Sequence, residues 1–375
     1  MTKPSPFTLQ IPEAALADLD ERLARTRWPD EPPLEPWSSG TSLAYLKGLV
    51  EYWKDDFDWR AEETRINELP QFTVPIAGID LHFIHVEGRG RNPMPLLLSH
   101  GWPGSVVEFL DIIPLLSEHF TVVAPSLPGY TLSFRPGQPR FGVEEIADCF
   151  AALMTDVLGY RRFGAQGGDW GAFIASRLAA RHPERLTGIH LNLLALPRDA
   201  QAIEHPTPEE SAYLAQLKRF AREETGYQWI QGTKPQTLAF GLTDSPAGLA
   251  AWIVEKFRRW TDCNGDPENA VTKDEMLTNI MLYWVNGAIG CSFWPYYARM
   301  HGPWPVPDAG VKVPTGYVEF PKEILHPPRS VAQRMYTNIQ RWTVAPRGGH
   351  FAALEQPELL AREIREFFQP LREGA

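Results

Sequence analysis

Residues 164–171 read Gly-Ala-Gln-Gly-Gly-Asp-Trp-Gly, and this stretch decides the fold of the chain. A strand-like run precedes it and a helical pattern follows it, which is the context of a nucleophile elbow, a tight turn that projects one side chain into a site. Such a turn tolerates only small neighbours, and Gly167 and Gly171 stand two residues to either side of Asp169. Taken alone, the pattern fits equally well a helix N-cap aspartate after a strand.

The elements around this turn indicate an α/β fold. From residue 71 onward short apolar runs alternate with helical patterns, and several runs lack polar alternation, as expected for a mostly parallel central sheet with helices on both faces. Strand signals stop between 196 and 302, where aromatic-rich helical patterns follow one another. We therefore expect four regions: an N-terminal helical arm wrapping core and cap (1–70), the first part of the core (71–195), a helical cap or lid (196–302) and the second part of the core (303–375).

Helical patterns in the arm cover residues 12–27 and 42–60, separated by a stretch rich in proline and tryptophan. The whole chain has 375 residues, 43% of them hydrophobic, and a formal net charge of −10, which excludes a nucleic-acid binder that needs a basic surface. Three widely spaced cysteines favour buried thiols over disulfides. Because no apolar leader and no apolar run of about 18 residues is present, we expect a cytoplasmic protein without membrane attachment.

Two further segments follow predicted strands. In the run 99–105, Ser-His-Gly-Trp-Pro-Gly-Ser, a backbone N–H is placed to join that of Trp170 in holding a developing oxyanion, although Gly-Trp-Pro-Gly is also ordinary turn sequence. Near the C-terminus, His350 follows two glycines after a strand-like run and is positioned as a general base. An acid is then wanted between the nucleophile and the histidine. Glu323, in the loop after the run 313–320, is favoured over Glu319 at the strand end, because loops usually deliver the partner of the histidine.

The order nucleophile, acid, histidine is that of the α/β-hydrolases. Together the motifs resemble those of the epoxide hydrolases of the microsomal and juvenile-hormone type. His-Gly-Trp-Pro-Gly-Ser (100–105), Gly-Gly-Asp-Trp-Gly (167–171) and Arg-Gly-Gly-His-Phe-Ala-Ala (347–353) match that family's active-site segments, and the cap runs 226–237 and 244–257 look like family sequence. The resemblance extends over essentially the whole chain, including the N-terminal arm.

The resemblance implies the α/β-hydrolase fold and a residue for each catalytic role. The nucleophile, base and charge-relay acid are, in that order, Asp169, His350 and Glu323. Two cap tyrosines placed over the epoxide oxygen match Tyr227 in Thr-Gly-Tyr-Gln-Trp and Tyr296 in Trp-Pro-Tyr-Tyr-Ala, with the adjacent Tyr297 as an alternative to Tyr296.

The implied reaction opens an epoxide in two steps. Asp169 attacks an sp³ carbon to form an ester while a tyrosine donates to the departing oxygen, and water activated by His350 then releases a vicinal diol. A serine would instead give an ether that water does not cleave. The backbone N–H groups of Trp102 and Trp170 are expected to meet the oxyanion, and these two residues with the two tyrosines are expected to bind the substrate.

The expected partners are a lipophilic epoxide and water, with no metal, no organic cofactor, no nucleic acid and no membrane. A homodimer is left open. Two other functions fit part of the pattern. A haloalkane dehalogenase uses the same aspartate attack, with Trp102 and Trp170 holding halide, but the arm and the cap tyrosines argue against it. A catalytically silent binding protein on the same fold is disfavoured by the joint presence of nucleophile, base, acid and tyrosines.

Overall fold

The computed structural model describes residues 3–196, 203–305 and 310–373, and its centre is a single sheet. Within these residues the sheet has nine strands in the order β1-β2-β3-β5-β4-β6-β7-β8-β9. Strands β1, β2, β3 and β5 pair antiparallel, and all pairings from β5 through β4 to β9 are parallel. The strands are β1 (Ser5–Phe7), β2 (Gln71–Ile76), β3 (Ile79–Val86), β4 (Met94–Ser99), β5 (Phe120–Pro125), β6 (Phe163–Gly167), β7 (Leu186–Leu191), β8 (Thr315–Glu319) and β9 (Ile339–Val344).

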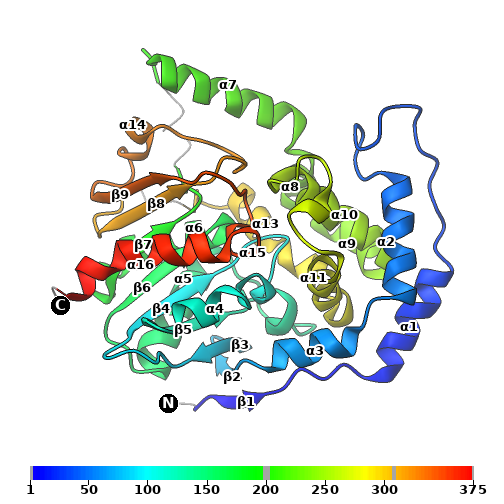
Figure 1. The fold of residues 1–375 in the computed structure, drawn as a ribbon, viewed down its shortest axis with the longest axis horizontal. Coiled ribbons are helices and arrows are strands. Elements are labelled where there is room, and N and C mark those ends of the chain that lie inside the picture. Colours follow the sequence, from blue (N-terminus) through cyan, green and yellow to red (C-terminus); the bar gives the residue numbers. More distant parts are fainter. Residues whose placement is uncertain (1–2, 197–202, 306–309, 374–375) are drawn as a thin grey trace.

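Helices cover both faces of the sheet (Figure 1). On one face lie α4 (Ile112–Leu116) and α16 (Pro357–Glu373), and on the other α5 (Val143–Ala152) and α6 (Asp169–Arg181). The central strands are apolar on both sides for this reason, and all six residues of β5 are buried. The predicted α/β fold with a mostly parallel sheet is confirmed.

A run of helices joins β7 to β8 and lies beside one end of the sheet (Figure 1). We call this segment the cap and keep the boundaries 196–302 as a proposal. Its described part, 203–302, holds α7 (Pro208–Glu223), α8 (Gly226–Thr233), α9 (Pro235–Asp244), α10 (Pro246–Trp260), α11 (Lys273–Asn286), α12 (Ile289–Ser292) and α13 (Trp294–His301). In α11, Thr272 and Glu275 form a capping box at the N-terminus, which fixes where this helix begins.

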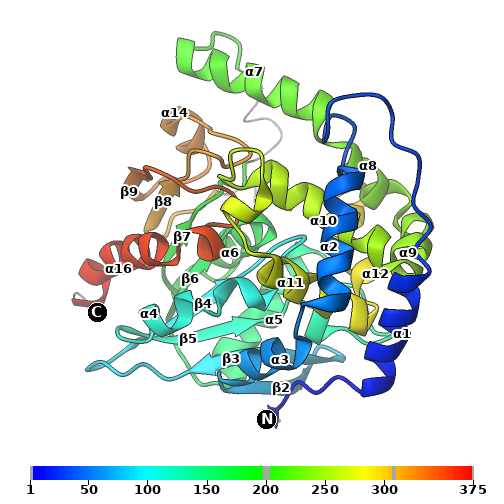
Figure 2. The same ribbon diagram turned by 45° about the vertical axis from the view of Figure 1, so that its right-hand side comes forward.

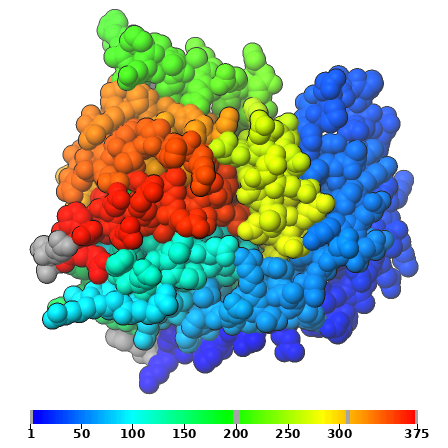
Figure 3. Space-filling view, viewed as in Figure 1, coloured from blue at the N-terminus to red at the C-terminus, as the bar shows by residue number. Residues whose placement is uncertain are grey.

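The arm runs along the outside of the cap (Figures 2 and 3). Its helices are α1 (Glu13–Ala24), α2 (Leu43–Asp55) and α3 (Trp59–Asn67), so the single helix predicted over 42–60 is wrong. The chain leaves the helix after Asp55, and the side chain of Asp58 accepts a hydrogen bond from the Ala61 backbone N–H to begin α3. The arm also contributes an edge strand, β1, that the sequence did not indicate.

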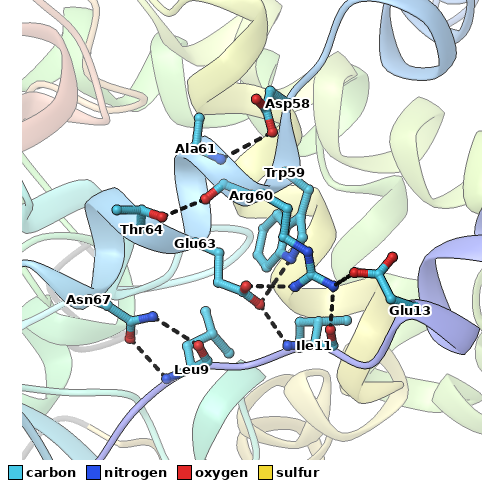
Figure 4. A network of polar contacts seen from close by, with 10 residues as sticks. All are labelled: Leu9, Ile11, Glu13, Asp58, Trp59, Arg60, Ala61, Glu63, Thr64 and Asn67. Atoms are coloured by element: carbon cyan, nitrogen blue, oxygen red, sulfur yellow. Dashed lines mark hydrogen bonds and ion pairs between the residues drawn. The ribbon is translucent and has the colours of Figure 1, made fainter.

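A buried carboxylate fastens the start of the arm to α3 (Figure 4). Glu63 accepts hydrogen bonds from the Ile11 backbone N–H at 2.6 Å and from the Trp59 indole at 3.2 Å. Arg60 pairs with Glu63 at 2.6 Å and also contacts Glu13. The extended segment before α1 is therefore held by polar contacts as well as by apolar packing.

Polar contacts also join the arm to the cap. Arg22 of α1 pairs with Asp244 at 2.7 Å, and the Tyr52 hydroxyl of α2 donates to Asp274 at 2.8 Å. The Thr41 hydroxyl donates to the backbone carbonyl of Ala251 at 2.6 Å.

The three cysteines are buried free thiols, as the sequence predicted. Among the described helices, none combines the length and apolar character needed to cross a membrane.

Candidate active site

Asp169 stands at the sharp turn between β6 and α6. Its φ is 45°, in the left-handed region that a non-glycine residue rarely adopts and that stores backbone strain. The turn packs against the end of β4 so closely that a Cβ on Gly171 would lie 1.9 Å from the Ser99 carbonyl oxygen. The glycine two residues after the aspartate is thus required by contact with the neighbouring strand, and the aspartate side chain is directed out of the sheet.

The loop after β4 supplies a hydrogen bond to this carboxylate. The Trp102 backbone N–H donates to Asp169 Oδ1 at 2.7 Å. Gly101 permits the approach, because a Cβ there would lie 2.2 Å from the same oxygen. The Trp170 N–H belongs to the first turn of α6, where backbone amides have no partner within the helix and carry the positive end of its dipole.

Helix α11 of the cap holds the same loop from above. The Asn279 side chain donates to the Pro103 carbonyl at 2.8 Å, and the Tyr283 hydroxyl donates to the Gly104 carbonyl at 2.7 Å. Both acceptors directly follow Trp102 in the chain. The position of the Trp102 amide is therefore fixed jointly by β4 and by the cap.

His350 lies between two carboxylates. Its Nδ1 is 2.5 Å from Glu323 Oε1, and its Nε2 is 3.5 Å from Asp169 Oδ2. Both His350 and Glu323 are buried. The loop carrying the histidine is held by the cap, since the His350 backbone N–H donates to the Trp260 carbonyl at 2.8 Å. The sequence left Glu319 as an alternative acid, and it is Glu323 that contacts the histidine, whereas Glu319 ends β8 beside β9.

The two carboxylates control the protonation of His350. Burial alone would lower the pKa of His350, but the facing Glu323 and Asp169 outweigh it and raise the pKa well above its usual value. Both carboxylates therefore favour the protonated imidazolium over the neutral ring. Any reaction that neutralises Asp169 removes one of the causes of this rise.

Two tyrosines of the cap lie beside Asp169. Tyr227 of α8 and Tyr296 of α13 are both buried, with ring centroids 5.7 Å apart. Tyr227 stacks on Trp102 at 5.3 Å, and Tyr296 meets Trp170 edge-on at 4.8 Å. Burial raises the pKa of both phenols, and the negative charge of Asp169 acts in the same direction, so both phenols keep their proton at physiological pH.

Tyr297, the alternative that the sequence left open, points elsewhere. Its ring stacks on His301 at 3.9 Å and on Trp294 at 4.8 Å. It lines a hollow that Asp169 and Trp170 do not reach.

A cavity of about 270 Å³ connects these groups. Asp169, Trp170, Tyr227 and Tyr296 line it, and most of the remaining wall is apolar. That wall comes largely from α7 and from the segments after β7 and β8, and it includes Phe173, Leu193, Leu194, Tyr213, Leu217, Phe220, Trp304, Ile324 and Leu325.

Three polar residues of the site were missed by sequence reasoning. Glu108 lines a smaller hollow of about 20 Å³ next to Asp169 and His350, and burial raises its pKa to about 8. Gln228 and Arg299 line the large cavity. Glu108 carries no sequence signal, because it follows a loop whose sequence is that of an ordinary turn. Gln228 carries none either, because it is next to Tyr227 on a helix, where consecutive side chains point in different directions.

Within the described ranges, no group of three or more histidine, cysteine, aspartate or glutamate side chains is arranged to hold a metal ion.

Two family models match this chain. Residues 4–109 match the family model described as epoxide hydrolase N terminus, and residues 94–242 match the α/β-hydrolase fold. The chain is 43% identical to a putative epoxide hydrolase of Stigmatella aurantiaca, covering 98% of this chain and 85% of that protein. It is 38% identical to epoxide hydrolase 1 of Oryctolagus cuniculus, covering 96% and 88%.

Solved structures agree with this assignment. The juvenile hormone epoxide hydrolase of the silkworm Bombyx mori superposes with a TM-score of 0.90 at 33% identity, covering 100% of this chain and 96% of that one. The epoxide hydrolase of Aspergillus niger gives a TM-score of 0.85 at 31% identity, covering 98% and 97%. At these identities and coverages the chain belongs to the epoxide hydrolases of the α/β-hydrolase fold, the enzymes of the microsomal and juvenile-hormone type.

Proposed function

We propose that this epoxide hydrolase converts lipophilic epoxides to vicinal diols through a covalent ester on Asp169. One observation carries the proposal: Asp169 Oδ1 receives the Trp102 N–H at 2.7 Å while its Oδ2 faces His350 Nε2 at 3.5 Å. A carboxylate held in this way has one oxygen fixed by a hydrogen bond and the other directed between the base and the cavity. The apolar wall of the cavity favours a lipophilic substrate.

In the first step Asp169 attacks an epoxide carbon. The carbon–oxygen bond of the ring breaks, an ester bond forms, and the departing oxygen takes a proton from Tyr227 or Tyr296. A carboxylate needs no prior deprotonation for this attack. The two phenols face the same cavity as Asp169, which supports their assignment as donors.

In the second step water attacks the ester carbonyl of Asp169. Because the ester carries no charge, one of the two carboxylates that raise the pKa of His350 is gone, and the neutral histidine accepts one proton of the attacking water while Glu323 stabilises the imidazolium that forms. The imidazolium passes this proton to the phenolate left by ring opening. The other proton of the water goes to the diol oxygen as the ester bond breaks, which restores the Asp169 carboxylate. The Trp102 and Trp170 amides meet the oxyanion, and one such donor contributes about 3 kcal/mol in related chemistry.

The change His350→Gln tests the two-step scheme. The variant is expected to open the epoxide but not to hydrolyse the ester, so incubation with styrene oxide should increase the mass of the intact protein by the mass of the epoxide. The control is the double variant carrying Asp169→Asn as well, which should show no increase. Normal turnover by His350→Gln, or an adduct that persists without Asp169, would contradict the proposal.

A single turnover in heavy-oxygen water tests the same proposal in the unaltered enzyme. The label is expected in the side chain of Asp169, because water attacks the carboxyl carbon of the ester. Label found in the diol of the first turnover would mean that water attacks the epoxide directly.

Haloalkane hydrolysis is the second candidate, favoured by one observation. The indole N–H groups of Trp102 and Trp170 are buried and have no hydrogen-bond partner within the described residues, as a halide site would require. The two cap tyrosines beside Asp169 favour the epoxide. Halide release from 1-chlorobutane without diol formation from styrene oxide would reverse the order of the two candidates.

A further inference from the structure

The hydroxyl of Tyr227 is engaged by a short chain of polar side chains. Gln228 Nε2 donates to the Tyr227 hydroxyl oxygen at 2.9 Å, and Arg299 Nη2 donates to Gln228 Oε1 at 2.9 Å. Gln228 and Tyr227 are neighbours on α8, while Arg299 comes from α13, the helix that carries Tyr296. All four side chains line the large cavity. The chain thus links the two cap helices at the level of the phenols.

The chemistry of arginine fixes the direction of these hydrogen bonds. A guanidinium group only donates, so the atom of Gln228 that faces Arg299 must be the carbonyl oxygen. The amide nitrogen then faces Tyr227 and donates to the phenol oxygen. Because that bond uses a lone pair of the phenol oxygen, the hydroxyl hydrogen of Tyr227 is left for another acceptor. Without Arg299 the amide is free to turn over and to take that hydrogen itself.

Arg299 is held where it can act in this way. Its guanidinium lies 5.4 Å from the Trp170 ring, 5.6 Å from the Tyr296 ring and 5.5 Å from the Trp304 ring. These aromatic faces favour a cation at this position. Burial is the main cause that raises the pKa of both phenols, and the charge of Arg299 acts against it at Tyr227 and Tyr296. At Tyr227 the Gln228 hydrogen bond acts in the same direction as Arg299.

We propose that Gln228 and Arg299 are positioning residues for ring opening, which keep the hydroxyl of Tyr227 directed at the epoxide oxygen and stabilise the phenolate it becomes. The inference rests on the proposed function. In the step concerned, the epoxide carbon–oxygen bond breaks as the Asp169 ester forms, and the Tyr227 O–H bond breaks as its proton moves to the departing oxygen. The phenolate keeps the Gln228 N–H, and its lost proton is replaced from the one that His350 takes from water in the second step.

Ring opening is measured alone in the His350→Gln background, as the rate at which the intact protein gains the mass of styrene oxide. Adding Arg299→Met is expected to slow this rate about tenfold, because the variant loses the hydrogen bond that orients Gln228 and the positive charge near the phenols. Arg299→Lys, which still donates and is still a cation, should recover most of the rate. Arg259→Met is the matched control, because Arg259 is also an arginine of the cap and its guanidinium donates to Glu224 in a solvent-exposed contact. It should leave the rate unchanged.

Gln228→Glu tests the direction of the hydrogen bonds at nearly constant shape. A carboxylate accepts from both neighbours, so it should draw the Tyr227 hydrogen away from the epoxide and slow ring opening more than Gln228→Met does. In a Tyr227→Phe background, Arg299→Met is expected to have no further effect, since its action passes through that hydroxyl. Melting temperatures of all variants separate these effects from unfolding.

The outcomes distinguish the inference from the function it rests on. If no mass gain occurs in His350→Gln itself, the proposed function fails. If the mass gain occurs and Arg299→Met leaves its rate unchanged, the positioning role is overturned. It is also overturned if Arg299→Met slows the mass gain as much in the Tyr227→Phe background as it does when Tyr227 is present. That role is also overturned if Gln228→Glu opens the ring faster than Gln228→Met, or if Arg299→Met slows hydrolysis of the preformed ester as much as its formation.

Discussion

An aspartate needs no base to activate it for attack, so the proposed role of Asp169 gives its neighbours a different task from those of a serine. The Trp102 amide holds one oxygen at 2.7 Å, and His350 faces the other at 3.5 Å without needing to remove a proton from it. In the proposed mechanism the histidine acts only later, when the carboxylate of Asp169 has become an ester. His350 would then serve as a base beside a neutral group.

The adjacent tyrosines of α13 give a residue-scale prediction. Tyr296→Phe is expected to lower kcat/KM for styrene oxide by about a hundredfold. This is the low end of the usual contribution of a general acid, because Tyr227 still donates a proton in the variant. Tyr297→Phe should leave kcat/KM within about twofold, because that ring stacks on His301 outside the cavity. Steady-state kinetics of the two variants decide between them. A larger loss in Tyr297→Phe would mean that the site uses the other tyrosine.

How far the sequence predicted the site depends on the kind of residue. Residues in glycine-bounded loops, such as Asp169 and His350, were identified because the backbone geometry requires small neighbours that are visible in the sequence. Glu323 was favoured over Glu319 by its place in a loop, and it is the one that contacts His350. Gln228 and Arg299 were not found, because their importance lies in hydrogen bonds between two helices 71 residues apart in the chain. The catalytic roles of all these residues stay predictions.

At the scale of elements, the strands and core helices follow from apolar runs, whereas the arm does not. Its proline- and tryptophan-rich stretch has no periodicity, so neither the break between α2 and α3 nor the strand β1 was predicted. What decides this region is long-range polar contact, in particular the hydrogen bond from the Ile11 backbone to Glu63. Such a pairing, 52 residues apart, leaves no local pattern.

The arm gives the prediction at this scale. Glu63→Ala is expected to lower the free energy of unfolding by about 2–3 kcal/mol, because the Ile11 N–H and the Arg60 guanidinium lose a buried acceptor. Urea denaturation measures the change. Glu21→Ala, which removes an exposed pair with Arg25, is the control and should cost less than about 0.5 kcal/mol. Equal losses in the two variants would show that the network of Figure 4 does not fasten the arm.

At the scale of the whole molecule, the free energy of unfolding depends on the buried carboxyl group of Glu108, which lies beside Asp169. Burial is the main cause that raises the pKa of Glu108, to about 8, with His350 opposing and Asp169 adding to it. The ordinary value is 4.5, so the folded protein holds this proton over a pH range in which the unfolded chain has lost it. Stability from this group is therefore full below about pH 4.5 and falls as the pH rises to about 8.

Glu108→Gln removes this dependence. The unfolding free energy of the variant minus that of the unaltered protein is expected to increase as the pH rises from about 4.5 to about 8, and to level off above it. Denaturation at a series of pH values measures this difference. The exposed Glu118→Gln serves as control, with a difference that does not change over the same range. A flat difference for Glu108→Gln would show that the carboxyl is ionised in the folded protein.

Asn279 and Tyr283 of the cap donate hydrogen bonds to the carbonyls of Pro103 and Gly104. These contacts limit how this enzyme can be recombined with its relatives. Helix α11 and the loop 101–105 are far apart in the gene, yet one sets the pose of the other. A chimera that takes its cap from a relative lacking both side chains would lose the contacts that hold the Trp102 amide against Asp169. Crossovers for directed evolution are best chosen so that these two segments descend from the same parent.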